Sequence, residues 1–177
     1  MPPRRRLSAQ QEAERLLLEL GIAQTPVPVE TVAERLGAQV LRHRMDATQS
    51  GMTFRQDDLV VIGINAAHHP RRQRFTLAHE IGHVRLHPGR PLTVDSSIRV
   101  DFRDGISSLA TDSEEIEANA FGAALLMPAT AVRAQVRALH DNGLRSRERL
   151  VADLSATFDV SIEAMGYRLI NLGLSSA

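Results

Sequence analysis

The apolar residues of this chain recur with the 3.6-residue period of an α-helix along most of its length, and they alternate with a period of two only in a short central stretch. Together with N-cap residues and with the Gly and Pro residues that end helices, the helical pattern predicts seven helices. They are Ser8–Leu20, Val29–Leu36, Arg71–His87, a helix capped at Thr111 that runs to about Met127, Ala129–Leu139, Arg147–Phe158 and Ile162–Leu172.

The central stretch favours β-strands at Ala38–Arg44, Gly51–Arg55 and Leu59–Asn65, of which the last is richest in β-branched residues. Residues 88–112 are polar and irregular, with one further strand expected at Ile98–Phe102. The prediction is therefore an α+β fold, in which a small sheet packs on a mostly helical chain.

The helix Arg71–His87 contains the sequence His79-Glu80-Ile81-Gly82-His83, which matches the pattern H-E-x-x-H. Residues four apart lie on one helix face, so both imidazoles can bind one metal ion while Glu80 borders its open coordination position. The pattern is typical of metallopeptidases in which the Glu is the general base. The alternative is a helix that carries two histidines by coincidence.

A catalytic zinc site usually has three protein ligands and a water, so a third ligand is expected elsewhere in the chain. Glu117 is preferred because on a helical wheel it lies within an apolar face, where a carboxylate is costly unless it binds a partner. Glu114 is the alternative on the same side of the helix, although it also completes the capping box that begins at Thr111. Glu115 points away on this wheel and is expected to be a solvated acid of the first turn.

The predicted site therefore has His79, His83 and Glu117 as metal ligands and Glu80 as the catalytic residue. Zn²⁺ is the expected ion, and the same ligands suit Mn²⁺ or Fe²⁺. The chain has no cysteine, which excludes thiolate ligands. His87, one turn beyond His83, is expected to act at the helix C-terminus.

Composition excludes several other classes of protein. The 177 residues include 43% hydrophobic and 24% charged residues, which suits one compact domain, and the net charge is zero. Such a chain has no overall field that would attract nucleic acid. No apolar run reaches the length of a membrane span or a signal peptide, so a cytoplasmic location is expected.

Two sequence blocks resemble the ImmA/IrrE family of metallopeptidases. The first runs from Arg72 to Gly89 and includes the H-E-x-x-H pattern, and the second runs from Glu115 to Pro128 and resembles the family signature E-x-E-A-N-x-F-A-A-x-L-L-M-P. The resemblance covers roughly residues 30–173. It implies a minimal zincin fold, a zinc site of His79, His83 and Glu117 with Glu80 catalytic, and cleavage of helix-turn-helix repressors. Gly122 departs from the usual Ala, a change expected to cost mainly helix propensity.

The carboxyl-terminal part, residues 150–169, resembles a helix-turn-helix with Asp159 at the turn. Residues 145–177 carry four Arg against four acids, which does not indicate a DNA-binding surface. Helices that pack on the core or bind a protein partner are therefore favoured. The predicted division is a zincin-like domain over residues 1–140 and a helical segment over residues 141–177 that packs on it.

The functional hypothesis is a zinc-dependent endopeptidase of narrow specificity that cleaves a transcriptional repressor or an antitoxin-like regulator. The substrate would be a helix-turn-helix protein, with no membrane and no direct nucleic-acid binding involved. One alternative is a metal-sensing or partner-binding module without turnover, which would not need a general base at Glu80. A second alternative, a DNA-binding regulator, would need a basic surface that the charge balance does not provide.

Overall fold

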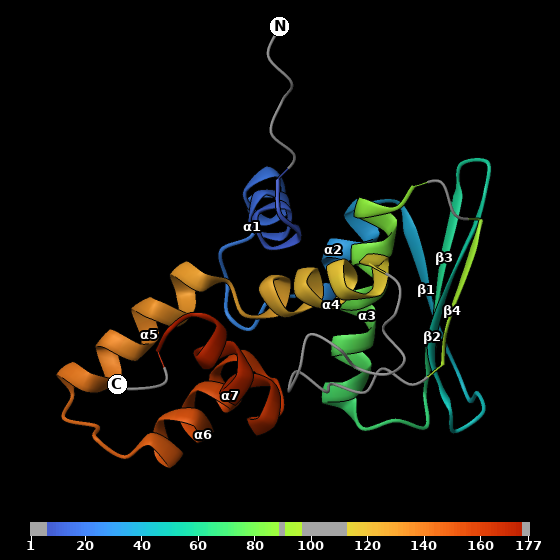
Figure 1. Cartoon of the computed structure of the whole chain (residues 1–177). Helices are drawn as coiled ribbons and strands as arrows, with labels where there is room; N and C mark the ends of the chain where they lie inside the picture. Colours follow the sequence, from blue (N-terminus) through green and yellow to red (C-terminus); the bar gives the residue numbers. More distant parts are fainter. Residues whose placement is uncertain (1–6, 89–90, 97–112, 175–177) are drawn as a thin grey trace, which may run out of the picture.

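The structure is a computed structural model that describes residues 7–88, 91–96 and 113–174 (Figure 1). Its elements are α1 (Ala9–Glu19), α2 (Val29–Arg35), β1 (Ala38–His43), β2 (Gln49–Gln56), β3 (Leu59–Asn65), α3 (Pro70–Leu86), β4 (Leu92–Ser96), α4 (Ser113–Leu126), α5 (Ala129–Asp141), α6 (Arg147–Phe158) and α7 (Ile162–Asn171). The expected α+β class is confirmed, and so are the predicted helices, within a residue or two at their described ends. The cap expected at Thr111 lies outside the described residues.

The four strands form one sheet in the order β1-β3-β2-β4. β2 and β3 make a hairpin across a two-residue turn, at which Asp57 adopts a φ of 51°. β1 pairs with β3 in parallel, and β4 adds an antiparallel edge to β2. The sequence did not predict β4, and the strand expected at Ile98–Phe102 lies outside the described residues.

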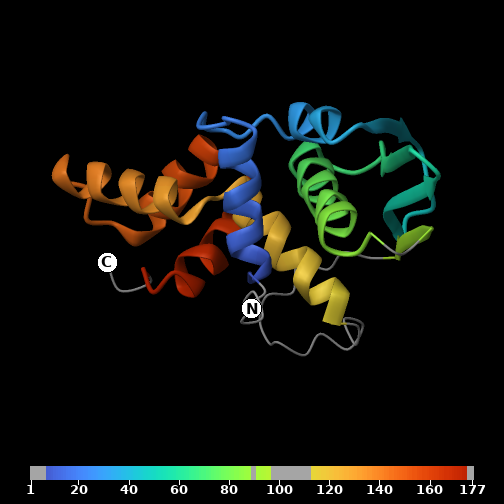
Figure 2. The same cartoon turned by 90° about the horizontal axis from the view of Figure 1, so that it is seen from above.

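Helix α3 runs between the sheet and the other helices, as Figures 1 and 2 show from two sides. Every residue from Phe75 to His83 is buried. On the sheet side it meets Gly51 and Thr53 of β2, and on the other side it packs against α4. A fully enclosed helix holds its side chains in fixed rotamers, which suits a site that needs defined geometry.

Two glycines allow the backbones of α3 and α4 to come close together. A Cβ atom on Gly82 of α3 would lie 3.1 Å from the Cα of Ala118, and a Cβ on Gly122 of α4 would lie 3.0 Å from the backbone nitrogen of His79. Gly122 therefore does more than change helix propensity, which was all that the sequence indicated. Both glycines set the separation of the two helices at the level of the histidines.

Helices α5, α6 and α7 form the left-hand part of the molecule in Figure 1 and are joined to the rest by buried and half-buried arginines. Arg168 of α7 is 2% exposed and donates to the carbonyl of Met127 and to the side chain of Gln10 on α1. Asp159, the turn residue between α6 and α7, has a φ of 51° and pairs with Arg71 and Arg74 of α3. The helix-turn-helix-like unit, formed by α6 and α7, therefore contacts the first turns of α1 and α3 and the residue that follows α4.

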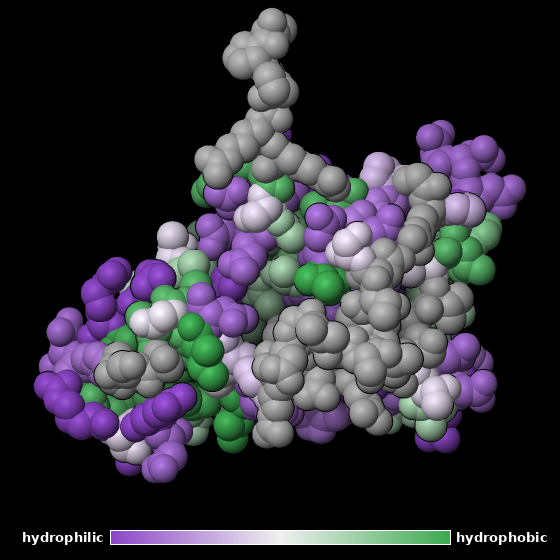
Figure 3. Space-filling view, in the orientation of Figure 1, coloured by the Kyte–Doolittle hydropathy of each residue, from purple (hydrophilic) through white to green (hydrophobic). Residues whose placement is uncertain are grey.

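The outer face of the sheet is open to solvent. Its exposed apolar residues, one from each strand, are Leu41, Phe54, Leu59 and Leu92. In Figure 3 apolar residues gather over the sheet and over the C-terminal helices, within a mostly polar surface. Among the helices that the structure describes, none combines the length and the apolar character needed to cross a bilayer.

The contact at Gly82 predicts that a Gly→Val substitution lowers the free energy of unfolding at this position more than at an uncrowded glycine. Gly82→Val would force γ-carbons into the backbone of Ala118 and should lower the free energy of unfolding by about 1–3 kcal/mol, the usual cost of overpacking. Gly166→Val in α7, where nothing lies within 4 Å of the added Cβ, should change it by less than about 0.5 kcal/mol. Urea denaturation of both variants measures the difference, and equal effects would contradict the proposed role of Gly82.

Candidate metal centre

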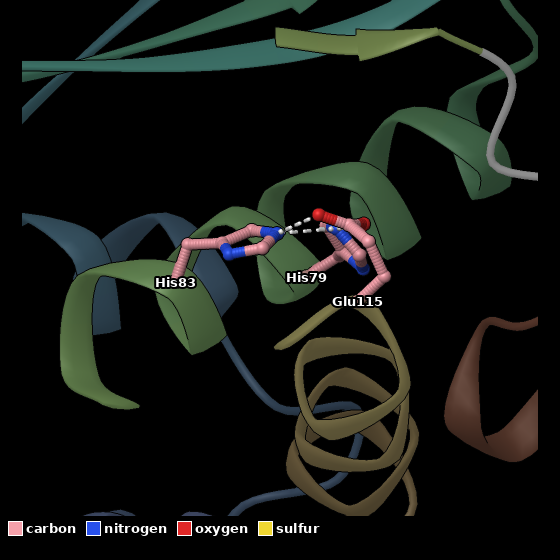
Figure 4. Close-up of side chains that lie close together, drawn as sticks. All are labelled: His79, His83 and Glu115. Atoms are coloured by element: carbon pink, nitrogen blue, oxygen red, sulfur yellow. Dashed lines mark hydrogen bonds and ion pairs between the residues drawn. The ribbon is translucent and has the colours of Figure 1, made fainter. Parts of the chain in front are cut away.

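The two histidines of the H-E-x-x-H pattern lie one turn apart on α3 and point to the same place (Figure 4). Their Nε2 atoms are 3.0 Å apart, and their ring centroids are 4.7 Å apart. His79 is 0% and His83 is 2% exposed. Two buried imidazoles whose nitrogens converge require a shared proton or a shared cation, because polar atoms are costly to bury without a partner.

Glu115, from the first turn of α4, completes the group. Its Oε2 lies 3.3 Å from Nε2 of His79, and its Oε1 lies 3.2 Å from Nε2 of His83. All three residues offer ligand atoms within 4.8 Å of one another. In a tetrahedral zinc site with bonds of about 2.0–2.1 Å, neighbouring ligand atoms are about 3.3 Å apart. The three side chains therefore have the spacing of a metal centre.

Asn119 sets the orientation of His79. Its Oδ1 lies 3.0 Å from Nδ1 of His79 and accepts from it, so Nε2 is the nitrogen that faces the cluster, where it can hold a proton shared with Glu115 or, in the neutral ring, offer a lone pair to an ion. Asn119 lies one turn after Glu115, so the same face of α4 supplies a carboxylate to the cluster and holds one of its imidazoles in the required tautomer.

The histidines also determine the charge of Glu115. Burial by itself raises the pKa of the Glu115 carboxyl, but hydrogen bonds and charge from His79 and His83 outweigh burial and bring this pKa well below its usual range. Glu115 is therefore an anion at neutral pH. Two imidazoles and one carboxylate form a donor set that suits zinc and other first-row divalent ions.

Glu80 lies next to His79 but turns toward the sheet. It is fully buried, and its Oε2 accepts a hydrogen bond of 2.6 Å from the hydroxyl of Thr53 on β2. A Cβ atom on Gly51 would lie 2.7 Å from Oε1 of Glu80, so the absence of a side chain there makes room for the carboxylate. The sheet thus supports Glu80 from the side opposite to α4.

The structure does not bring Glu117, the preferred third ligand from the sequence, to the histidine pair. Glu117 is 40% exposed at its side chain, and its Oε2 lies 3.7 Å from Nε2 of His87. The alternative Glu114 is not part of the three-residue group either, and its backbone carbonyl oxygen lies 3.3 Å from the same atom of His87. Glu115, which the sequence assigned to solvent, takes the position instead.

The physical reason is that a helical wheel of α4 contains no information about how α4 crosses α3. Both α3 and α1 pack against α4, so apolar residues surround most of it and do not mark one ligand face. The crossing is determined by the contacts of Gly82 with Ala118 and of Gly122 with His79. A usable signal was the stripe of small and polar residues that includes Glu115, Ala118, Asn119 and Gly122.

Comparisons with known proteins agree with this geometry. A family model described as the IrrE N-terminal-like domain, a peptidase family, matches residues 33–170. The chain is 34% identical over 115 residues to the radiation response metalloprotease IrrE of Deinococcus radiodurans, a match that covers 62% of this chain and 30% of that protein. The family resemblance inferred from the sequence is thereby confirmed.

Among solved structures, a Mycobacterium tuberculosis transcriptional regulator is similar, with a TM-score of 0.56 and 19% identity. The match covers 91% of this chain and 46% of that one, and it shows a shared fold. The chain thus spans less than half the length of the solved protein, and less than a third of the length of the curated one.

The cluster predicts which acid controls metal binding. Mutation of residues that only orient metal ligands usually weakens metal binding by roughly 10–100-fold. Glu115→Gln should weaken Zn²⁺ binding by more than this, because it removes the anionic ligand atom itself. Glu117→Gln should weaken it far less. Competition with a chromophoric chelator measures both affinities. Retention of zinc in Glu115→Gln together with its loss in Glu117→Gln would restore the ligand set expected from the sequence.

Proposed function

The chain belongs to the IrrE N-terminal-like family of metallopeptidases, and we propose that it is a zinc-dependent endopeptidase that cleaves a transcriptional regulator. The observation that carries the proposal is the convergence of His79, His83 and Glu115 on one point, beside a buried Glu80. The relative named as a radiation response metalloprotease supports a role in stress responses.

In this proposal His79, His83 and Glu115 hold the ion, and Asn119 keeps His79 in the tautomer that can bind it. Zinc bound by such a set supplies a Lewis acid, which polarises a peptide carbonyl and makes water more acidic. Three protein ligands leave a coordination position open for the reaction. The same donors also suit Mn²⁺ or Fe²⁺.

Glu80 is the proposed general base. It takes a proton from the attacking water and gives it to the leaving amine nitrogen as the peptide bond breaks. Its carboxylate is enclosed by protein, and the hydroxyl of Thr53 donates to Oε2 and limits rotation of the group. A metal-sensing module would have no need of a carboxylate buried at this position, because burial of an acid is costly without a task.

The proposed substrate is a helix-turn-helix repressor or an antitoxin-like regulator in the cytoplasm. The family resemblance of the sequence supports this choice. Cleavage between the DNA-binding and dimerising parts of a repressor would abolish operator binding, because paired half-sites require a dimer. The neutral net charge suits an enzyme that meets the regulator rather than the DNA.

Replacement of Glu80 should separate metal binding from turnover. Glu80→Gln keeps the shape of the side chain and can still accept from Thr53, but it cannot take a proton. Zinc content should stay at the wild-type level, while the rate of cleavage should fall by at least about 10²–10⁴-fold. Glu163→Gln, on an exposed position of α7, is the matched control. Near wild-type cleavage by Glu80→Gln would exclude this residue as the base.

Substrate choice can be tested with the helix-turn-helix repressor encoded beside the gene. The zinc-loaded protein should cut this repressor at one site, should leave casein intact and should lose activity with a chelator. Mass spectrometry of the products locates the cut. Efficient metal-dependent digestion of casein with the repressor untouched would show a general peptidase. Zinc binding with no cleavage of either would favour a metal-sensing module.

A further inference from the structure

His87, at the end of α3, is a buried imidazole that the proposed ligand set does not use. It is 9% exposed and lies one turn beyond His83, with the two ring centroids 5.6 Å apart. Burial of an imidazole is unfavourable unless its nitrogens have partners. Its contacts therefore indicate what it contributes.

The ring of His87 contacts the first turn of α4, on both sides of Glu115 in the sequence. Its Nε2 lies 3.3 Å from the carbonyl oxygen of Glu114 and 3.7 Å from Oε2 of Glu117. A carbonyl oxygen only accepts, so Nε2 donates to it. The peptide group that receives this bond is the one that joins Glu114 to Glu115. His87 thus fixes the backbone from which the third ligand projects.

Arg55 of β2 holds the same end of α3 from the sheet. Its Nη2 donates to the carbonyl of His83 over 2.8 Å, and its Nη1 reaches the carbonyl of His87 over 3.4 Å. The carbonyl of His83 also accepts from the backbone N–H of His87, so Arg55 adds a second hydrogen bond at the end of the helix, where a cation also interacts favourably with the helix dipole. Burial lowers the pKa of Arg55, which is the cost of placing this cation against the helix.

We propose that Arg55 and His87 are positioning residues that hold Glu115 close enough to His79 and His83 for all three to bind one ion. Arg55 fixes the end of α3 to the sheet, and His87 fixes the start of α4 to that end. The inference rests on the proposed metal site, and it concerns metal affinity rather than the reaction. We call these two residues the clamp. Without it, the first turn of α4 can move, and a Glu115 carboxylate displaced by a fraction of an ångström binds the ion less well.

The test measures the Zn²⁺ affinity of the full chain after removal of metal, by competition with a chromophoric chelator. His87→Ala should weaken binding by about 10-fold or more, within the range usual for groups that orient ligands. His87→Gln keeps an N–H donor near the position of Nε2 and should recover affinity to within about 3-fold of wild type. His43→Gln, which removes an exposed histidine of β1, should bind as wild type does.

Arg55→Met provides a second variant, which keeps the aliphatic stem and removes both bonds to the helix end. It should also weaken zinc binding by about 10-fold, and it decides the question if His87→Ala does not fold. Urea denaturation of the metal-free variants separates the effect from general instability. If the clamp acts as proposed, the loss of zinc affinity, expressed as a free energy, exceeds the loss of unfolding free energy of the metal-free protein.

Wild-type affinity in both His87→Ala and Arg55→Met would overturn the proposal. An equal loss in His87→Ala and His87→Gln would also overturn it, because His87 would then be a ligand itself. Failure of the proposed function is a separate result. If the variants behave as expected but the wild-type protein cleaves no substrate, the clamp stands and the peptidase proposal falls.

Discussion

The backbone contact between α3 and α4 is the constraint on which the rest of the site depends. Gly82 and Gly122 have no side chains, so the two helices approach until backbone meets backbone. Metal ligands must be placed within about 0.5 Å to act together. A helix separation set by long, flexible side chains would not give that accuracy, whereas backbone contacts at two points do. The distances of 3.0–3.3 Å among the three ligand residues follow from this arrangement.

The limits of sequence-based prediction follow from the same contact. The proximity of His79 and His83 was predictable because both residues lie in one helix, where a spacing of four residues is sufficient. Glu115 was missed because its relation to them depends on how two helices cross. Strand β4 was missed for a different reason. Leu92–Ser96 is short, and it follows Pro88, Gly89 and Pro91, which usually mark loops. The turn at Asp159 was predicted well because its chemistry is local.

The C-terminal helices use features of a helix-turn-helix for internal contacts. Asp159 adopts the left-handed backbone that such turns require, and its carboxylate is engaged by Arg71 and Arg74 of α3. The one cation of α7, Arg168, points into the protein toward Met127. The contacts of Asp159 tie the position of α6 and α7 to α3, the helix that carries both histidines.

The proposed ligands are divided between α3 and α4, which would link the stability of the protein to its supply of metal. Of the three proposed ligands, only His79 and His83 stay close to each other in the unfolded chain, so an ion that needs all three binds the folded form preferentially. Such preferential binding adds about 2.7 kcal/mol of stability when the free ion exceeds its dissociation constant 100-fold. If the proposed metal site is correct, loss of metal would therefore act on the protein in two ways, first by emptying the site and then by leaving a less stable chain exposed to proteolysis.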